Sequence, residues 1–452
     1  MSITTNNLCF SYNQNTKILN QINLTIPTAK FSLLIGPTGC GKSTILKILA
    51  GLYPKYAGQT TGNVDLDGLQ AGMMFQHAGE QFTMATPREE IIFALENLQV
   101  SPEQYSQRLA HGVEFTQIKQ LLDQKINTMS GGEQQRVALA VLVAMDLDLF
   151  LLDEPFASCD PEARRFLIDK LGQLQTQGKT IIVSDHLLND YAGICDYLFQ
   201  FKNGTITKLS DHEKDQLLTQ GQTAASYCFA VPNNKAACFT LTNVQIAHKR
   251  LLLQQPELKI AAGKTTLITG ANGTGKTSLF NALTKMIPYI GSIAYYDQEI
   301  SKLSARKYLL NVAQVFQNAT DQFLSVTVAD EIALSKKQGL NPFFTSEKIN
   351  QTLNYLDLDQ HLDQVVYTLS GGQQKKLQIF LMLLTNQDVL LFDEPLSGLD
   401  EASSKKVVQL MQESQQARHQ TFLIISHDLH NLAPWCDYHL VLQHQHLSYS
   451  TK

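Results

Sequence analysis

The sequence predicts an α/β fold built on a parallel sheet and present twice along the chain. Short apolar runs end just before glycine-rich or acidic segments, and sequences suited to helices follow them. Strands that alternate with helices form parallel sheets with right-handed crossovers. Several short patterns also recur in the same order in the second half of the chain. Together these observations predict two tandem copies of one α/β domain.

The elements can be assigned in order within each half. The expected buried strands are 31–35, 150–152 and 180–184 in the first half, and 266–269, 389–392 and 421–426 in the second. Helices are expected to begin over 43–50 and 277–284, directly after the two glycine-rich segments. Each half therefore repeats one arrangement of a buried strand, a glycine-rich loop and a helix.

Composition excludes several classes of function. The formal net charge of −5 provides no basic field for a phosphate backbone, so nucleic acid is disfavoured as the main partner. Seven scattered cysteines without a C-x-x-C pair favour a reducing compartment over disulfides or a cysteine-rich metal site. No apolar stretch approaches the ~20 residues that span a bilayer, and no signal-peptide pattern begins the chain. We expect a cytoplasmic protein that reaches a membrane only through another subunit.

The repeat has the size of a whole domain. Lys42 returns as Lys276, 234 positions later, and Gln76 returns as Gln317, 241 positions later. The difference reflects seven extra residues around 289–309, for which we expect a peripheral β-hairpin. The expected boundaries are a first domain at 1–215, a polar linker at 216–235 and a second domain at 236–452.

The pattern G-x-x-x-x-G-K-[ST] occurs in each half between an expected strand and an expected helix. Such a loop turns backbone N–H groups toward phosphates, helped by the positive end of the helix. Lys42 and Lys276 would reach the β- and γ-phosphates, and the hydroxyls of Ser43 and Thr277 would coordinate Mg²⁺. ATP and Mg²⁺ are the expected cofactors, and an ordinary glycine-rich turn is the alternative. The expected phosphate-binding residues are Gly36, Pro37, Thr38, Gly39, Cys40, Gly41, Lys42, Ser43, Thr44, Gly270, Ala271, Asn272, Gly273, Thr274, Gly275, Lys276, Thr277 and Ser278.

Two adjacent acids end a buried strand in each half. Asp153 and Asp393 would hold Mg²⁺, while Glu154 and Glu394 would align the attacking water as general bases. Neighbouring strand residues face opposite ways, so each pair can divide these tasks. Buried acids without a nearby cation would be costly, which argues against a purely structural role.

The chain resembles a fused pair of ATP-binding-cassette subunits over nearly its whole length. The family signature is present as Met129-Ser130-Gly131-Gly132-Glu133 and as Leu369-Ser370-Gly371-Gly372-Gln373. The resemblance implies two P-loop NTPase nucleotide-binding domains, each with a RecA-like parallel-sheet core, a β-subdomain and a helical signature subdomain. It also implies head-to-tail pairing, in which Ser130, Gly131 and Gly132 serve the nucleotide of the second half and Ser370, Gly371 and Gly372 that of the first. A plain helix cap is the alternative interpretation of each signature.

Further residues have roles implied by the same resemblance. Gln76 and Gln317 would sense Mg²⁺ and the attacking water, and packing is the alternative. His186 and His427 follow apolar strands, where the family places a histidine that contacts the γ-phosphate. Tyr12 would stack on adenine, and His248 occupies the matching position in the second half. Both adenine-binding positions have core packing as their alternative.

The segments that begin at Gln76 and Gln317 indicate which process this ATPase drives. Gln76-x-x-x-x-Gln81-Phe82 and its second copy resemble the Q-x-P-x-x-Q-[LF] stretch of energy-coupling-factor and cobalt-type importer ATPases, although Ala78 and Ala319 replace the proline. The resemblance implies a membrane-embedded coupling subunit and a substrate-binding membrane protein as partners, at the cytoplasmic face of the membrane. The cargo would be a vitamin, a vitamin precursor or a metal ion. The alternative is a soluble tandem ATPase that acts on ribosomes, but the long charged linker and basic tails usual for that class are missing.

Overall fold

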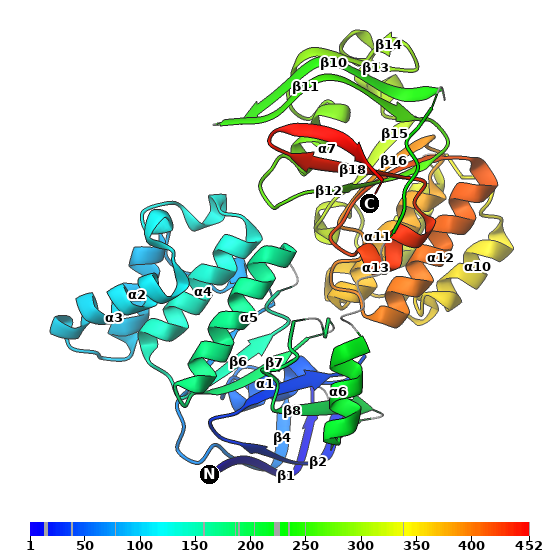
Figure 1. The fold of residues 1–452 in the computed structure, drawn as a ribbon. Helices are drawn as coiled ribbons and strands as arrows, with labels where there is room; N and C mark the ends of the chain where they lie inside the picture. The colour runs from blue at the N-terminus through cyan, green and yellow to red at the C-terminus, as the bar shows by residue number, and fades with distance from the viewer. Residues whose placement is uncertain are drawn as a thin grey trace. The chain divides into compact units, whose positions relative to one another are not determined.

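The computed structural model describes the chain apart from residues 13–16, 38, 77, 157–158, 186, 189, 203, 221–226, 234–235, 249, 338 and 452, and apart from the side chains of Gln220 and His248. The chain divides into two compact units, residues 1–224 and residues 225–452. The first unit is coloured from blue to green and the second from green to red (Figure 1). Each unit has a six-stranded sheet, a smaller antiparallel sheet and a group of helices.

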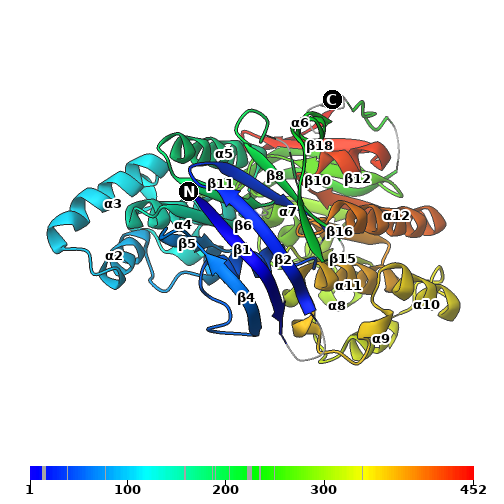
Figure 2. The ribbon, with the colours of Figure 1, turned by 90° about the horizontal axis from the view of Figure 1, so that it is seen from below.

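The first unit is built around the strand order β5-β6-β7-β3-β8-β9. All neighbours in this sheet are parallel except the last pair, β8 and β9. The strands are β3 (Phe31–Ile35), β5 (Ala71–Met74), β6 (Leu149–Asp153), β7 (Thr180–Ser184), β8 (Tyr197–Lys202) and β9 (Thr205–Lys208). The antiparallel sheet has the order β2-β1-β4, from β1 (Ser2–Ser11), β2 (Lys17–Pro27) and β4 (Gln59–Asp65), which lie side by side in Figure 2.

The helices of the first unit lie on the sheet and to one side of it. They are α1 (Lys42–Leu49), α2 (Pro87–Asn97), α3 (Pro102–Thr116), α4 (Gly131–Met145), α5 (Pro161–Thr176) and α6 (Asp211–Gln220). Helices α2, α3 and α4 gather away from β1, β2 and β4 (Figure 1). They enclose an apolar cluster of their own, which contains Ile91, Val113 and Val137. This group is the helical subdomain that carries the signature.

The second unit repeats this plan. Its main sheet has the order β15-β16-β17-β12-β18-β19, and its antiparallel sheet has the order β11-β10-β13-β14. The strands are β10 (Ala237–His248), β11 (Arg250–Ala261), β12 (Thr265–Thr269), β13 (Ile290–Tyr295), β14 (Gln298–Glu299), β15 (Val312–Val315), β16 (Val389–Asp393), β17 (Thr421–Ile425), β18 (Tyr438–Gln443) and β19 (His446–Ser450). The helices are α7 (Lys276–Leu283), α8 (Ala305–Tyr308), α9 (Val328–Lys337), α10 (Ser346–Tyr355), α11 (Gly371–Leu384), α12 (Glu401–Arg418) and α13 (Leu429–Leu432).

Burial explains why the central strands read as unbroken apolar runs. Every residue of β6, β7, β16 and β17 is buried, because helices cover both faces of a parallel sheet. By contrast, β2 alternates between buried and exposed residues over most of its length, as expected for a sheet with one solvated face. The predicted fold class, two tandem α/β nucleotide-binding domains with parallel-sheet cores, is confirmed.

The extra residues of the second half form the expected hairpin and more. Strands β13 and β14 pair antiparallel, with Ala294 opposite Glu299 and Tyr295 opposite Gln298. The short helix α8 follows before β15, whereas in the first unit β4 leads to β5 without a further helix or strand. The insertion therefore lengthens the edge of the antiparallel sheet and leaves the main sheet unchanged.

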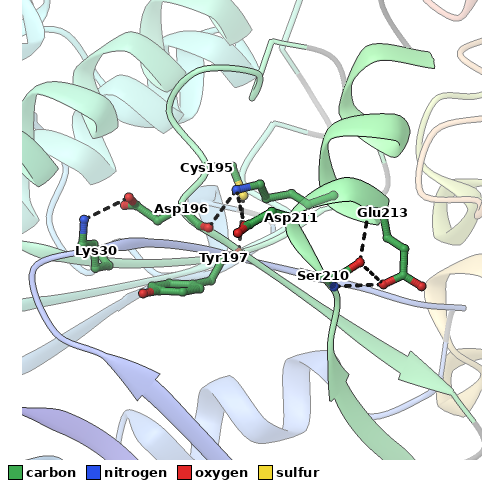
Figure 3. Close-up of polar contacts among 8 residues, drawn as sticks. Lys30, Cys195, Asp196, Tyr197, Ser210, Asp211 and Glu213 are labelled. Carbon is green, nitrogen blue, oxygen red and sulfur yellow. Dashed lines mark hydrogen bonds and ion pairs between the residues drawn. The ribbon is translucent and has the colours of Figure 1, made fainter.

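The join between the units is shorter than the predicted linker of 216–235. Residues up to 220 belong to α6, whose N-terminus is capped by bonds from Ser210 to the carboxylate of Glu213 (Figure 3). Lys214 of this helix donates to the carbonyl of Asp196, and Leu218 is buried in the core of the first unit. On the other side, Phe229 packs into the core of the second unit. Two buried apolar side chains in a polar sequence anchor both ends of the segment.

None of the helices in the described part of the chain is long and apolar enough to cross a bilayer.

Candidate functional site

Each phosphate loop wraps its lysine. In the first unit Gly36, Gly39 and Gly41 have φ values of 152°, 80° and 108°, which suit glycine far better than residues with a side chain. A Cβ at Gly36 would also lie 2.8 Å from Phe201. The ammonium of Lys42 donates to the carbonyls of Gly36 and Pro37 at 2.8 and 3.2 Å. A buried positive charge is thus held at the centre of the loop.

The second loop has the same geometry. Lys276 donates to the carbonyls of Gly270 and Ala271 at 2.6 and 2.9 Å. Helices α1 and α7 begin at the two lysines, so their N-terminal N–H groups are available beside the loops. Such a loop can hold a triphosphate through backbone N–H groups and one ammonium.

A hydroxyl and a carboxylate meet at each loop. Ser43 donates to Asp153 at 3.0 Å, and Thr277 donates to Asp393 at 2.7 Å. The pKa of both aspartates lies above the ordinary value, because the effect of burial outweighs the opposing effect of these hydroxyl hydrogen bonds. Mg²⁺ is usually held by one or two carboxylates, a hydroxyl or water, and substrate phosphates, so the donor set fits this ion. Within the described residues there is no group of three or more His, Cys, Asp or Glu side chains that could hold a metal without the nucleotide.

The two predicted general bases share a strained backbone, and the structure gives a polar neighbour for each. Glu154 and Glu394 have φ values of 45° and 48°, a conformation that non-glycine residues adopt at a cost and that is often found at functional sites. Gln76 Nε2 donates to Glu154 at 3.0 Å. The carboxylate of Glu394 lies 3.6 Å from His427 Nε2. Burial and the neighbouring Asp393 raise the pKa of Glu394 to about 7.

The loops that carry Gln76 and Gln317 are closed internally by the second glutamine of each pattern. Gln81 accepts a bond from the backbone N–H of Phe75 at 3.0 Å, and Gln322 does the same for Phe316 at 3.2 Å. In the second unit the side chain of Gln317 is exposed. The glutamine pattern that resembles importer ATPases thus has a structural cause, since it fixes the shape of the loop.

The acidic pair after each loop has a similar function. Glu90 on α2 accepts bonds from the N–H groups of Thr83 and Met84 at 2.9 and 2.7 Å. Glu331 on α9 binds the N–H groups of Leu324 and Ser325 in the same way. These buried carboxylates satisfy backbone donors that would otherwise lack a partner. They hold the exposed loop against the helical subdomain.

The two histidine positions can be compared only in part. His427 Nε2 lies 3.0 Å from the Oδ1 atom of Asn272, so it is next to the phosphate loop as well as Glu394. His186 lies outside the described residues, as does Thr38. Asp185, the residue before His186, accepts hydrogen bonds from Arg164 at 2.8 Å and from Tyr191 at 2.7 Å. This buried network anchors the chain on the N-terminal side of His186.

The predicted adenine-binding positions are less equal. Tyr12 is half exposed and packs edge-on against Phe10 and Tyr53, so part of its ring is free to stack on a base. Burial and the contact with Tyr12 raise the pKa of Tyr53 to about 12. The side chain of His248 is among those that the structure does not describe.

Both signature serines are helix N-caps. Ser130 accepts a bond from the N–H of Glu133, whose carboxylate binds Ser130 in return, and Ser370 forms the same reciprocal arrangement with Gln373. The replacement of glutamine by Glu133 leaves this capping box intact, because either side chain offers an oxygen. The cap reading is therefore correct in geometry, and binding of a γ-phosphate by the same loops stays a prediction.

Sequence reasoning missed two cations near the second site. Arg250 Nη2 donates to the carbonyl of Gly273 at 3.0 Å. Lys375 on α11 is buried and donates to the carbonyls of Phe316 and Gln317 at 3.3 and 2.8 Å. A lysine followed closely by an apolar helical run was the available signal for Lys375, whereas nothing in the sequence distinguishes Arg250 from a surface residue.

Comparisons with known proteins match the two units to one family. The sequence profile described as ABC transporter matches residues 19–157 and 253–397. A putative HMP/thiamine import ATP-binding protein of Bacillus subtilis (strain 168), YkoD, is 29% identical and covers 99% of this chain and 91% of its own length. A putative ABC transporter ATP-binding protein of Treponema denticola is 30% identical and covers 97% of this chain and 95% of its own length.

Solved structures give a matching fold. A model of ribosome-bound archaeal Pelota and ABCE1 includes a chain with a similar fold. The TM-score is 0.74 at 18% identity, and the match covers 98% of this chain and 78% of that chain. The archaeal ribosome recycling factor aABCE1, in complex with ribosomal stalk protein aP1, has a TM-score of 0.66 at 20% identity. The match covers 96% of this chain and 87% of that chain. At this level of identity the likeness establishes the fold alone.

Proposed function

Because the chain belongs to the ABC transporter family and is an ATPase with two cassette domains, we propose that it energises an importer of the energy-coupling-factor type. The cargo would be a vitamin, a vitamin precursor or a metal ion. Its membrane-embedded partners would be a coupling protein and a substrate-binding protein, with this chain at the cytoplasmic face. The printed name of the Bacillus subtilis relative, which refers to HMP and thiamine import, supports this choice.

The observation that carries the proposal is an exposed apolar surface beside the Gln317 loop, here called the apolar edge. Its four exposed members are Leu324, Val326, Val365 and Tyr367. They lie on adjoining segments, because Val366 donates its N–H to the carbonyl of Val326 at 3.0 Å. Leu324 is 83% exposed. Exposed apolar side chains on adjoining, hydrogen-bonded segments favour a contact with a protein partner.

The first unit offers a different surface at the matching place. The equivalence is fixed by the bond from Ile126 N–H to the carbonyl of Ala85 at 2.9 Å, which corresponds to the bond between Val366 and Val326. The exposed residues there are Thr83, Ala85, Lys125 and Asn127. Two different contact surfaces on one chain suit a coupling subunit that binds each unit with a different segment.

The roles predicted for the site residues belong to this proposal. ATP would bind both phosphate loops, Ser43 and Asp153 or Thr277 and Asp393 would hold Mg²⁺, and Glu154 or Glu394 would align the water. Head-to-tail pairing of the signatures with the opposite nucleotides is included. Repeated closure and release of this pairing would supply the movement for transport.

Affinity purification from detergent-solubilised membranes tests the importer role. The chain should copurify with a membrane-embedded coupling protein and a small membrane protein in a defined ratio. Cofractionation with ribosomes, together with absence from the membrane fraction, would support a soluble tandem ATPase instead and would overturn the importer proposal.

The apolar edge provides a second test. Leu324→Glu should reduce recovery of the membrane partner at least about tenfold, because a charge would be buried against an apolar contact. ATP hydrolysis by the isolated chain should stay unchanged, since Leu324 is 83% exposed and is not one of the predicted site residues. Thr83→Glu in the first unit is the matched control and should reduce recovery less. Equal recovery for Leu324→Glu and the unmodified chain would remove the apolar edge from the partner interface.

A further inference from the structure

The feature that the predicted chemistry leaves unused is the buried lysine of α11. Lys375 is 3% exposed, and its ammonium donates to the carbonyls of Phe316 and Gln317. These two carbonyls begin the loop that carries the Gln317 side chain. Lys375 therefore joins the helix that follows the second signature to the loop at the second nucleotide site.

The charge on this lysine is as important as its bonds. Burial lowers the pKa of Lys375 to about 8, while the negative charges of Asp393 and Glu394 act in the opposite direction. The side chain is therefore still largely an ammonium at pH 7. Its charge in turn lowers the pKa of Asp393, one of the predicted Mg²⁺ ligands.

The first unit has a neutral group at the same position. Gln135 on α4 stands five residues after Ser130, as Lys375 stands five residues after Ser370. Its amide donates to the carbonyl of Gln76 at 3.3 Å, and its Oε1 atom is buried without a hydrogen-bond partner in the described structure. The tether between helix and loop is thus present in both units, but only the second tether carries a positive charge.

We propose that Lys375 is a positioning residue of the second nucleotide site: it fixes the Gln317 loop and places a buried positive charge within electrostatic reach of Asp393 and Glu394, which lowers the affinity of this site for Mg²⁺. A fixed cation in a partly buried site opposes a divalent ion that binds the same carboxylates. The inference rests on the proposed nucleotide sites and extends them to the control of metal affinity at the second one.

Three substitutions separate the charge from the tether. Lys375→Gln copies the first unit and keeps a donor for the loop carbonyls while removing the charge. Lys375→Arg keeps both the donor and the charge. Both Lys375 variants are made in the full chain with Lys42→Ala, so that nucleotide binding reports the second site. The third, Gln135→Lys in a Lys276→Ala chain, adds the charge to the first site.

The measurement is the Mg²⁺ concentration that half-saturates binding of a fluorescent ATP analogue at pH 7. Lys375→Gln should lower this concentration on the order of tenfold, Lys375→Arg should leave it unchanged, and Gln135→Lys should raise it. Emission of Trp435, the single tryptophan and a residue of the second unit, verifies that the Lys375 variants are folded.

Each other outcome is decisive. An unchanged midpoint in Lys375→Gln, with folded protein, would overturn the role of the charge and leave Lys375 a simple tether. If Lys375→Gln does not fold, Gln135→Lys decides the question at the first site, where an unchanged midpoint would overturn the proposal. Absence of any Mg²⁺-dependent binding in the Lys42→Ala chain itself would overturn the second nucleotide site, and with it the proposed function.

Discussion

The two units present the same predicted catalytic elements, but groups of different charge support their glutamine loops. In the first, Glu154 is held by the neutral amide of Gln76, and neutral Gln135 supports the loop. In the second, Glu394 lies near His427, and charged Lys375 supports the loop. A duplicated fold can therefore keep its backbone while its buried charges change.

At a second position the first unit has the buried charges and the second unit has neutral groups. This position lies next to the strands β7 and β17, which precede the two histidines. The first unit buries the ion pair of Arg164 and Asp185, whereas the matching positions of the second unit are Ser404 and Ser426. Each unit thus buries a charged group where the other has a neutral one. This comparison implies that the units differ in stability and in their response to pH, while each keeps the adjacent aspartate and glutamate that are predicted to act in ATP hydrolysis.

The largest expected effect on stability comes from breaking the buried ion pair of the first unit. Arg164→Met leaves Asp185 buried without its cation, which should destabilise the first unit by about 3–5 kcal/mol. Equilibrium unfolding in urea, followed by circular dichroism and by Trp435 emission, measures this. The transition of the first unit should move to lower urea while the Trp435 transition stays. Ser404→Ala, at the matching position, is the control, and an effect of similar size there would contradict the comparison.

The next effect is a pH dependence of the second unit that Glu394 contributes. Glu394 has a pKa of about 7 in the folded chain against an ordinary value of 4.5. The folded state thus binds a proton that the unfolded state has lost between these values, so stability falls as the pH rises from about 4.5 to 7. The difference corresponds to about 3 kcal/mol. Urea midpoints from Trp435 emission should show this decline, and Glu394→Gln should reduce it. An equally steep decline in Glu394→Gln would assign the effect to other groups.

The smallest effect is expected at the first signature. Glu133→Gln keeps the oxygen that caps Ser130 and removes only a charge near the start of α4. The free energy of unfolding should change by less than about 1 kcal/mol, because a charge at a helix N-terminus contributes about that much. Urea unfolding by circular dichroism measures it, with Gln373→Glu as the reverse change. A loss of several kcal/mol would show that the two capping boxes are not equivalent.

Much of the molecule could be predicted because its signals are local. Neighbouring residues determine the glycine loops, the strands that end in Asp153 and Asp393, and the signature caps. The sequence contains each of these features twice, once in each half. The roles of Gln81 and Glu90 in holding the loop, by contrast, became visible only once their backbone partners were placed. The burial of Lys375 had only a weak local signal, a lysine before an apolar helical run, because it results from α11 packing against β15. The predicted linker failed at its ends because single apolar residues, Leu218 and Phe229, outweigh a polar composition.

The central claim is that both sites are complete and hydrolyse ATP although they differ in charge. Steady-state ATP hydrolysis of Glu154→Gln and of Glu394→Gln, each with ATP binding measured in parallel, tests it most directly. Removal of a general base should slow its site about 10²-fold or more, so each single variant should lose a large part of the turnover while still binding ATP. Near-unmodified hydrolysis in either variant would show that its site is regulatory, and would contradict the account.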